Sequence, residues 1–368
     1  MSNHTRLHKD TARRVNTRYL SAERVAEIIN RKGIAECLAG VASYITQDFL
    51  RWTDFDKCPR MANHSEVGVI ELMPVSDARS YAFKYVNGHP SNYRYNLPTV
   101  MAFGVLADVA TGTPELISEL TITTAIRTAA MSAVAARALA RPGSKTMALI
   151  GNGAQSEFQA LAFHHLLGIE MFHLFDIDAG ATDKLVANLN RLGLGSRRFD
   201  STREAVTGCH IVTTVTADKT NATILTPEMI EPGMHINGVG GDCPGKTELH
   251  ADVLRLGPVF CEFEPQSRIE GDMQQMPADF PVTEIWQVLS GQATGRTSPE
   301  QVTIYDSVGF ALEDYSALRY MRDVAAELKM TETISLIPAL ANPKNLFGFL
   351  GGNRGEQTPV PAEVALAA

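Results

Sequence analysis

The chain of 368 residues lacks several features that mark special classes of protein. It has five scattered cysteines and no CxxC motif. This odd number predicts reduced thiols rather than a disulfide framework or a zinc site. No apolar stretch is long enough to cross a membrane, and residues 1–19 lack the apolar centre of a signal peptide. These absences lead us to expect a cytoplasmic protein.

Positive charge is also scarce. The chain has 33 Lys and Arg residues against 41 Asp and Glu residues, a net charge of −8. This balance disfavours a nucleic-acid partner and leaves no polybasic patch for a membrane surface. It is still compatible with a local cationic site for a small anion. The hydrophobic share of 45% is typical of globular proteins, and the length predicts two domains.

The most informative stretch is residues 147–159, MALIGNGAQSEFQ. A short apolar run ends in Gly151 and Gly153, and a helical pattern follows, which predicts strand, tight turn and helix. The first glycine permits the turn, and the second removes a Cβ where a phosphate must approach a helix N-terminus. The third position of the usual fingerprint is Ser156, an imperfect match. The alternative is an ordinary strand–loop–helix connection with two turn glycines.

Two patterns divide the chain. The first half predicts an α+β arrangement with an antiparallel meander: a helix over 21–49, strands over 64–74, 80–86, 99–108 and 115–119, and a helix over 121–139. The second half alternates strands and helices, which predicts a parallel sheet covered on both faces. Its strands are expected at 146–150, 172–175, 197–199, 210–215, 235–239, 259–262 and 302–307, and its main helices at 156–167, 181–192 and 310–328.

Asp176 follows the second strand of this alternation, 25 residues after Gly151. A carboxylate there can accept hydrogen bonds from an adenosine ribose, and it repels the extra phosphate of NADP, so the pattern favours NAD. The alternative is a solvated acid after a strand. Thr216, at the end of the fourth strand, is compatible with a cofactor contact and equally with an ordinary strand threonine.

Residues 239–249, VGGDCPGKTEL, follow the fifth strand. Gly240 and Gly241 let the backbone pass close to a ligand. A carboxylate at Asp242 can act as a general base or hold a substrate ammonium. Lys246 can neutralise a charge on cofactor or substrate. The alternative is a turn with a solvated acid and a solvated lysine.

Three cations precede the glycine motif: Arg60, Lys84 and Arg127; Lys84 lies inside an apolar run, and Arg127 lies at the start of a helix with an apolar continuation. A cation in such a position needs an anionic partner or a wet cleft. A substrate carboxylate would supply the anion. The alternative is a set of ion pairs with Glu66, Glu71 or Glu119. The histidines and cysteines have no metal-ligand spacing, so no metal is predicted.

Five stretches together resemble the ornithine cyclodeaminase and mu-crystallin family: residues 64–74, 83–90, 150–158, 240–249 and 306–314. The likeness extends from about residue 48 to residue 328 and is closest to the bacterial cyclodeaminases. The glycine loop and the Gly-Asp-x-Pro-Gly-Lys run are shared with dehydrogenases of the family. The mu-crystallin branch lacks an aspartate equivalent to Asp242, which argues against that branch.

The resemblance implies a homodimer and two domains per subunit. A Rossmann-type parallel-sheet domain over 129–310 would bind NAD. An α+β substrate-binding and dimerisation domain would comprise 1–128 and 311–350, followed by a mobile tail, 351–368. The implied reaction converts L-ornithine to L-proline and ammonia by internal hydride transfer through tightly held NAD.

The resemblance also implies residue roles. Asp242 would be the catalytic acid/base. The substrate would lie against Arg60, Glu71, Lys84, Arg127, Asp242 and Val308. The cofactor would lie near Thr99, Arg127, Gly151, Gly153, Ala154, Gln155, Asp176, Thr216, Val239, Gly240, Gly241, Asp242, Lys246 and Ser307. The alternatives are a ketimine reductase or alanine-type dehydrogenase, a lysine cyclodeaminase, and a non-catalytic protein that binds NAD or another small ligand.

Overall fold

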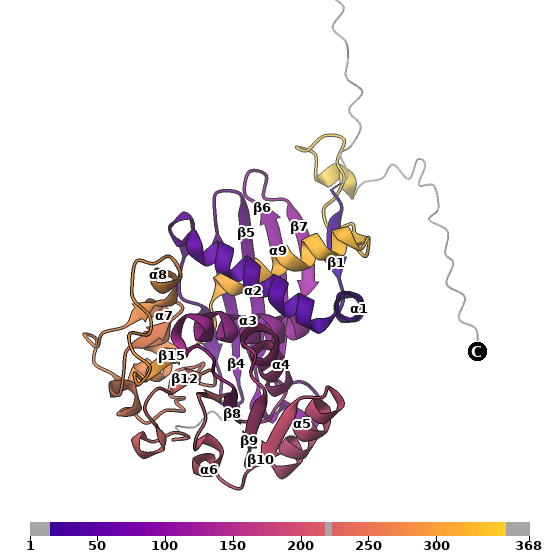
Figure 1. Ribbon diagram of the computed structural model, residues 1–368. Helices are drawn as coiled ribbons and strands as arrows, with labels where there is room; N and C mark the ends of the chain where they lie inside the picture. The colour runs from indigo at the N-terminus through magenta and orange to yellow at the C-terminus, as the bar shows by residue number, and fades with distance from the viewer. Residues whose placement is uncertain (1–14, 218–222, 351–368) are drawn as a thin grey trace, which may run out of the picture. The chain divides into compact units, whose positions relative to one another are not determined.

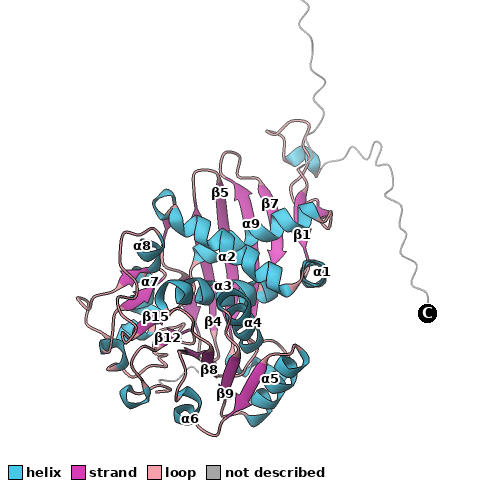
Figure 2. Cartoon of the chain, viewed as in Figure 1, coloured by secondary structure: helices cyan, strands magenta, loops and turns pink. Residues whose placement is uncertain are grey.

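The computed structural model describes residues 15–217 and 223–350. Residues 18–332 form one compact unit that contains two β-sheets and the helices packed on them (Figures 1 and 2). Residues 15–17 and 333–350 belong to a second unit, which holds the end of β16 (Glu332–Ile334) and the short helix η6 (Phe347–Phe349). The tail over 351–368 lies outside the described residues.

The first sheet contains the predicted antiparallel meander. Its order is β1-β7-β6-β5-β4-β2, and β3 also pairs with β4. Strands β4 to β7 are antiparallel neighbours, whereas β1 pairs with β7 in parallel. The bounds are β1 (Thr17–Leu20), β2 (Asp56–Lys57), β3 (Met61–His64), β4 (Val69–Ser76), β5 (Ser80–Gly88), β6 (Val100–Asp108) and β7 (Pro114–Glu119).

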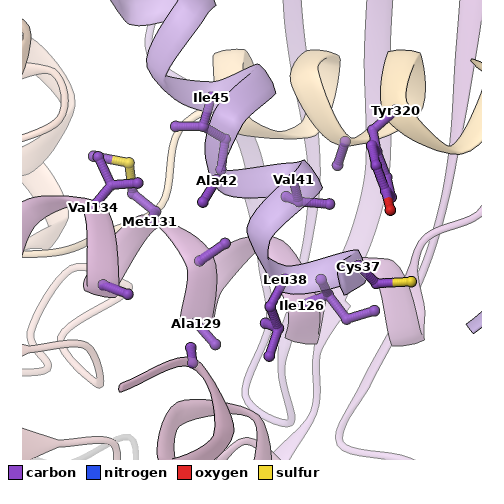
Figure 3. Packing of buried hydrophobic residues seen from close by; sticks show 14 of the residues in the cluster. Cys37, Leu38, Val41, Ala42, Ile45, Ile126, Ala129, Met131, Val134 and Tyr320 are labelled. Carbon is purple, nitrogen blue, oxygen red and sulfur yellow. The ribbon is translucent and has the colours of Figure 1, made fainter. Parts of the chain in front are cut away.

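Four long helices accompany this sheet: α1 (Ala22–Lys32), α2 (Ile34–Leu50), α3 (Thr121–Leu139) and α9 (Ala311–Glu327). Helix α9, although last in sequence, packs on β4, β5 and β6 and against α2. The interface of α2 with α3 buries aliphatic side chains that recur at helical spacing, among them Leu38, Val41, Ile45 and Ile126 (Figure 3). The predicted helix over 121–139 is confirmed.

Two predicted elements of the first half are each divided. The helix expected over 21–49 is broken at Gly33, whose φ of 88° lies in a region that favours glycine. Ser21 caps the first of the two helices as predicted, because its Oγ accepts a hydrogen bond from Arg24 N at 3.2 Å. The strand expected over 64–74 is β3 and β4, joined by a turn in which Ser65 Oγ donates to Gly68 O at 2.8 Å.

The second sheet is entirely parallel, as the alternating pattern predicts. Its order is β10-β9-β8-β11-β12-β15-β13-β14, so the chain starts in the middle at β8 and extends to both sides. Strand β15, the last of the predicted strands, inserts between β12 and β13. The bounds are β8 (Thr146–Ile150), β9 (Met171–Phe175), β10 (Gly195–Arg198), β11 (Ile211–Thr214), β12 (His235–Gly238), β13 (Val259–Cys261), β14 (Thr283–Glu284) and β15 (Thr303–Asp306).

The helices between these strands are α4 (Ser156–Leu167), α5 (Ala179–Arg191), α6 (Thr202–Val206), α7 (Glu264–Glu270) and α8 (Ile285–Leu289). Short 3-10 helices are η1 (Trp52–Asp54), η2 (Pro90–Tyr95), η3 (Pro227–Met229), η4 (Val253–Arg255) and η5 (Asp272–Gln275). In an open parallel sheet, ligands bind outside the carboxyl ends of the strands, where the direction of winding reverses. Here that point lies between β8 and β11. No helix in the described ranges has the length and hydropathy to span a membrane.

Candidate active site

A cavity of about 310 Å³ lies between the first sheet and the carboxyl ends of the parallel strands. Every residue predicted to contact the substrate lines it: Arg60, Glu71, Lys84, Arg127, Asp242 and Val308. Most of the remaining predicted cofactor residues line it too: Thr99, Gly153, Ala154, Gln155, Thr216, Val239, Gly240, Lys246 and Ser307. Gly151, Asp176 and Gly241 lie outside the lining. Residues more than 200 positions apart in the sequence therefore line one cavity.

The glycine loop at one side of the cavity has the predicted strand–turn–helix form. Gly151 has a φ of 94°, and a Cβ there would lie 2.7 Å from Val215 O on the neighbouring strand end. A Cβ on Gly153 would meet open space within the cavity. Helix α4 begins at Ser156, whose Oγ donates to Gly153 O at 2.6 Å. The serine at the third fingerprint position thus closes the loop by a hydrogen bond.

Asp176 holds this loop from the next strand. Its Oδ2 accepts a hydrogen bond from Asn152 N at 2.6 Å, and its Oδ1 accepts one from Asp178 N at 2.8 Å. The carboxylate is therefore at the predicted end of β9 and beside the glycine loop, although it does not reach the cavity. These hydrogen bonds explain how Asp176 fixes the glycine loop. The contact of Asp176 with a ribose stays a prediction.

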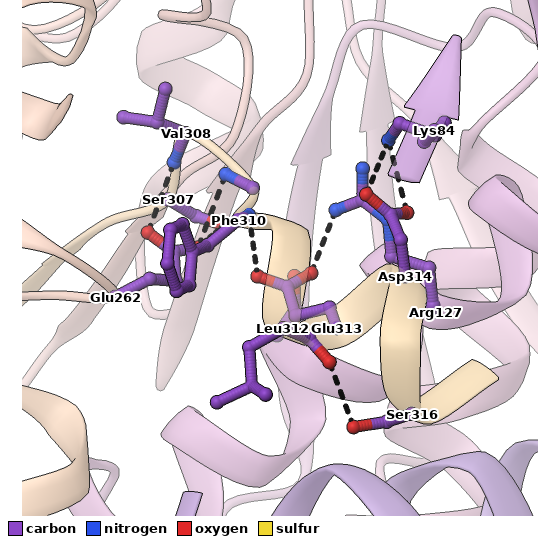
Figure 4. Close-up of polar contacts among 12 residues, drawn as sticks. Lys84, Arg127, Glu262, Ser307, Val308, Phe310, Leu312, Glu313, Asp314 and Ser316 are labelled. Carbon is purple, nitrogen blue, oxygen red and sulfur yellow. Dashed lines mark hydrogen bonds and ion pairs between the residues drawn. The ribbon is translucent and has the colours of Figure 1, made fainter. Parts of the chain in front are cut away.

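Two of the three cations are neutralised by α9. Lys84 is 1% exposed, and its Nζ lies 2.9 Å from Asp314 Oδ2 (Figure 4). Arg127 Nε lies 3.0 Å from Asp314 Oδ1, and its Nη1 lies 2.7 Å from Glu313 Oε2. The predicted alternative of pairing with Glu66 or Glu119 is wrong, because the partners come from the first turn of α9. The Glu119 carboxylate instead accepts the N–H groups that begin α3.

Burial shifts the pKa of both a cation and an acid among these paired side chains. It lowers the pKa of Lys84 to about 8, and the charge of Arg127 adds to the effect. Burial also raises the pKa of Glu313 to about 7, although Arg127 opposes the shift.

All three guanidinium nitrogens of Arg60 have partners within the protein. Its Nη1 donates to Glu71 Oε2 at 3.0 Å, which confirms one of the predicted ion pairs. Its Nη2 donates to Val308 O at 2.8 Å and Gly309 O at 2.6 Å. Its Nε lies 3.0 Å from Glu270 Oε2. The guanidinium thus ties β4 and α7 to the turn that follows β15.

The sequence reasoning missed three acids of this site: Glu270, Glu313 and Asp314. The last two lie in a run that carries the family resemblance and in the first turn of a predicted helix, so a signal was present. Their partners are more than 180 residues away, and spacing along the chain says nothing about such contacts. Among the described residues, no group of His, Cys, Asp and Glu side chains is arranged to hold a metal ion.

Glu270 offers a pH test of the site's electrostatics. It is 3% exposed, and burial raises its pKa to about 7 against the opposing charge of Arg60. The unfolded chain loses this proton near pH 4.3, so the contribution of Glu270 to stability is fully present below that pH and disappears as pH rises to about 7. Relative to wild type, the free energy of unfolding of Glu270→Gln should therefore increase across this window, by up to about 3 kcal/mol.

Urea unfolding at pH 5, 6, 7 and 8 measures this difference. Glu264→Gln, on the same helix but 41% exposed, is the matched control and should show little pH dependence relative to wild type. A Glu270→Gln difference that stays constant across the series would contradict the assignment.

Asp242 lies at the mouth of the cavity on the loop after β12. Its side chain is 54% exposed, and its Oδ1 lies 3.1 Å from Lys246 Nζ. Lys246 is itself buried and also donates to Thr216 O at 3.0 Å. Although burial opposes it, the charges of Asp242 and Glu248 raise the pKa of Lys246. A carboxylate with one fixed cationic neighbour and one open side can accept a proton from a ligand in the cavity.

These features define an enzyme of the dinucleotide-binding parallel-sheet class, with a cavity at the strand ends that is lined by both cations and carboxylates. Residues 23–329 match the ornithine cyclodeaminase/mu-crystallin family, and the chain belongs to that family. The family resemblance and the fold class predicted from the sequence are thereby confirmed.

Individual relatives agree with this membership. A protein of Agrobacterium fabrum named ornithine cyclodeaminase is 55% identical over 332 residues, which are 90% of this chain and 94% of that protein. A lysine cyclodeaminase, solved to explain recognition of L-lysine, L-ornithine and L-2,4-diaminobutyric acid, has a TM-score of 0.84 at 28% identity over 89% of this chain and 98% of its own. An archaeal alanine dehydrogenase dimer with bound NAD has a TM-score of 0.80 at 27% identity, over 88% of this chain and all of its own.

Proposed function

We propose that this protein is an NAD-dependent ornithine cyclodeaminase that converts L-ornithine to L-proline and ammonia. The observation that carries the proposal is the single cavity whose lining brings Arg60, Lys84 and Arg127 together with Asp242. The family membership and the 55% identity to the Agrobacterium fabrum enzyme support the same reaction.

The residues present fit NAD. The open space beside Gly153 and the N-terminus of α4 would take the pyrophosphate, because no side chain caps this helix and the first N–H groups of a helix have no partner within it. Asp176 would accept a hydrogen bond from the adenosine ribose, and Thr216, Gly240 and Lys246 would lie along the cofactor. When bound, NAD supplies the hydride acceptor for the substrate Cα and the hydride donor that completes the product.

The protein's own side chains bind, orient and move protons. We assign the substrate carboxylate to Arg60, Lys84 and Arg127, since arginine and lysine hold carboxylates by charge-assisted hydrogen bonds. An anchored carboxylate leaves the distal amine free to fold back on Cα. Ring closure is then intramolecular, and such fixed geometry supplies much of the rate.

Asp242 is assigned the proton transfers. The distal amine of a basic amino acid is almost entirely an ammonium at neutral pH, with a pKa near 10.4. The Asp242 carboxylate would take its proton, so that nitrogen can attack Cα, and would return a proton to the departing ammonia. Lys246 would keep this carboxylate aimed at the cavity.

The test is turnover with a trace of NAD. We expect L-ornithine to give equal amounts of proline and ammonia without a lasting rise in NADH absorbance. L-Ornithine deuterated at Cα should give proline that keeps the deuterium at Cα. Stoichiometric NADH that carries the deuterium would point to an amino-acid dehydrogenase instead.

A lysine cyclodeaminase is the second candidate, because a structure of that enzyme matches this fold closely. One methylene in a pocket is worth about 1–3 kcal/mol, so the ratio of the two kcat/KM values decides between them. A panel of L-ornithine, L-lysine and L-2,4-diaminobutyrate with products identified by mass spectrometry measures it. Cofactor binding without turnover of any of these amino acids would indicate a binding protein.

We further assign residues 129–310 to the NAD-binding domain and residues 1–128 with 311–350 to the substrate domain. We propose a homodimer in the cytoplasm that acts in L-proline formation and ornithine breakdown. The outer face of the first sheet supports the dimer, because it exposes large apolar side chains: Met61, Ile70, Leu72, Tyr81 and Phe103. Ile70 and Leu72 alternate along β4 with the buried Glu71 and Met73, so they point away from the cavity.

A further inference from the structure

Glu248 is a buried acid that contacts two loops of the proposed cofactor site, those of Thr216 and Gly240. It is 1% exposed. Its Oε1 accepts hydrogen bonds from Thr216 N at 2.7 Å and from Thr216 Oγ1 at 2.6 Å. Its Oε2 accepts one from Gly240 N at 2.8 Å. Because Thr216 follows β11 and Gly240 follows the adjacent β12, one carboxylate joins two neighbouring loops of the site.

The Glu248 carboxylate occupies the space that a side chain at position 240 would need. A Cβ on Gly240 would lie 2.1 Å from Glu248 Oε1 and 2.3 Å from Glu248 Cδ. Any side chain at position 240 would therefore push the carboxylate off its bonds. The first glycine of the Gly240-Gly241 pair is therefore required by its contact with Glu248 as well as by the approach of a ligand.

Glu248 is itself anchored in the protein interior. Its backbone N and that of Leu249 both donate to Asp272 Oδ1 at 2.8 Å. Asp272 N in turn donates to Asp306 Oδ1 at 2.9 Å, at the end of β15. Three buried acids, Asp306, Asp272 and Glu248, therefore connect β15 to the loops after β11 and β12. Asp306 accepts the Asp272 N–H, Asp272 accepts the Glu248 N–H, and Glu248 accepts N–H groups of the two loops.

We propose that Glu248 is a positioning residue for the cofactor, which holds Thr216 and Gly240 at the spacing that NAD requires. The proposal rests on the assignment of NAD to this site. A carboxylate can accept hydrogen bonds at both oxygens, whereas a glutamine presents an amino group to one of the two N–H donors. Charge-assisted bonds of this kind are about twice as strong as neutral ones.

The test is the dissociation constant for NAD, measured by calorimetry on the purified full-length protein. In Glu248→Gln we expect it to rise about tenfold or more, because at least one charge-assisted anchor is lost. Gly240→Ala should reproduce the defect, since the methyl group displaces Glu248. The double variant should be no worse than the poorer single one, because both changes act on the same contact.

Asp48→Asn is the matched control. Asp48 is also fully buried, and it binds Ser316, Arg319 and Arg51 in the helical layer rather than the cofactor loops. This variant should lower the melting temperature and leave NAD affinity unchanged. If Glu248→Gln does not fold, Gly240→Ala carries the test.

Wild-type NAD affinity in either of the first two variants, or multiplicative losses in the double variant, would overturn the role of Glu248. An equal affinity loss in Asp48→Asn would overturn it as well, because the effect would then follow from general destabilisation. Wild-type protein that binds NAD but does not cyclise ornithine would refute the proposed function and leave this test intact.

Discussion

Replacing Asp242 by Asn should lower kcat on L-ornithine by about 10²- to 10⁴-fold, the usual contribution of a general acid/base. The amide keeps the size of the carboxylate and can still accept a hydrogen bond from Lys246, which lies 3.1 Å away. It cannot take a proton from the substrate ammonium. NAD affinity should stay close to wild type, because the change leaves the glycine loop and Glu248 untouched.

The residual activity of Asp242→Asn gives a second readout. Without a protein base, the reactive amine must lose its proton to solvent, and the neutral fraction grows tenfold per pH unit below its pKa of about 10.4. The logarithm of kcat should therefore rise with a slope near one between pH 7 and about 10. The control is Asp252→Asn, a 62% exposed acid farther along the same segment, which should have wild-type kinetics. Full activity of Asp242→Asn, or a flat pH profile, would remove Asp242 from the mechanism.

The order of elements was predictable because it depends on local patterns, whereas most residues of the cavity were named through the family resemblance. Helix α3, strand β8 and helix α4 begin and end at the predicted residues. Strand-end residues such as Asp242 and Thr216 could be placed together, since carboxyl ends of parallel strands share one edge of a sheet. The break at Gly33 was missed because helical periodicity continues across it, and only the positive φ separates the two helices.

The charge partners were not predictable in the same way. Lys84 and Arg127 were recognised as cations that needed an anion, either a substrate carboxylate or one of Glu66, Glu71 and Glu119. The actual partners, Glu313 and Asp314, are on α9, which returns to the first sheet after the whole parallel sheet has been made. Glu248 was hidden for a similar reason, since its bonds to Thr216 and Gly240 depend on two strands that become neighbours only in the fold.

The pairing across α9 predicts a large and unusual stability effect. Arg127→Met leaves Glu313 without its buried cation and Asp314 with Lys84 as its one remaining ion-pair partner. Breaking a buried pair in this way typically costs about 3–5 kcal/mol. We expect a loss of that size in the free energy of unfolding, measured in urea at pH 8. The loss should shrink at pH 6, because burial has already raised the pKa of Glu313 to about 7 and the carboxyl group can take up a proton.

Adding Glu313→Gln to Arg127→Met should recover part of the lost stability and none of the turnover. The glutamine removes a buried charge and can still accept the hydrogen bond that Phe310 N donates at 3.0 Å. Arg127 would still be missing from the carboxylate site, so kcat/KM stays low. The control is Arg198→Met, which breaks the exposed pair with Asp183 and should cost less than about 1 kcal/mol. Two outcomes would contradict the neutralisation of the α9 acids by Arg127. One is Arg127→Met with the stability of the control, and the other is a double variant no more stable than Arg127→Met.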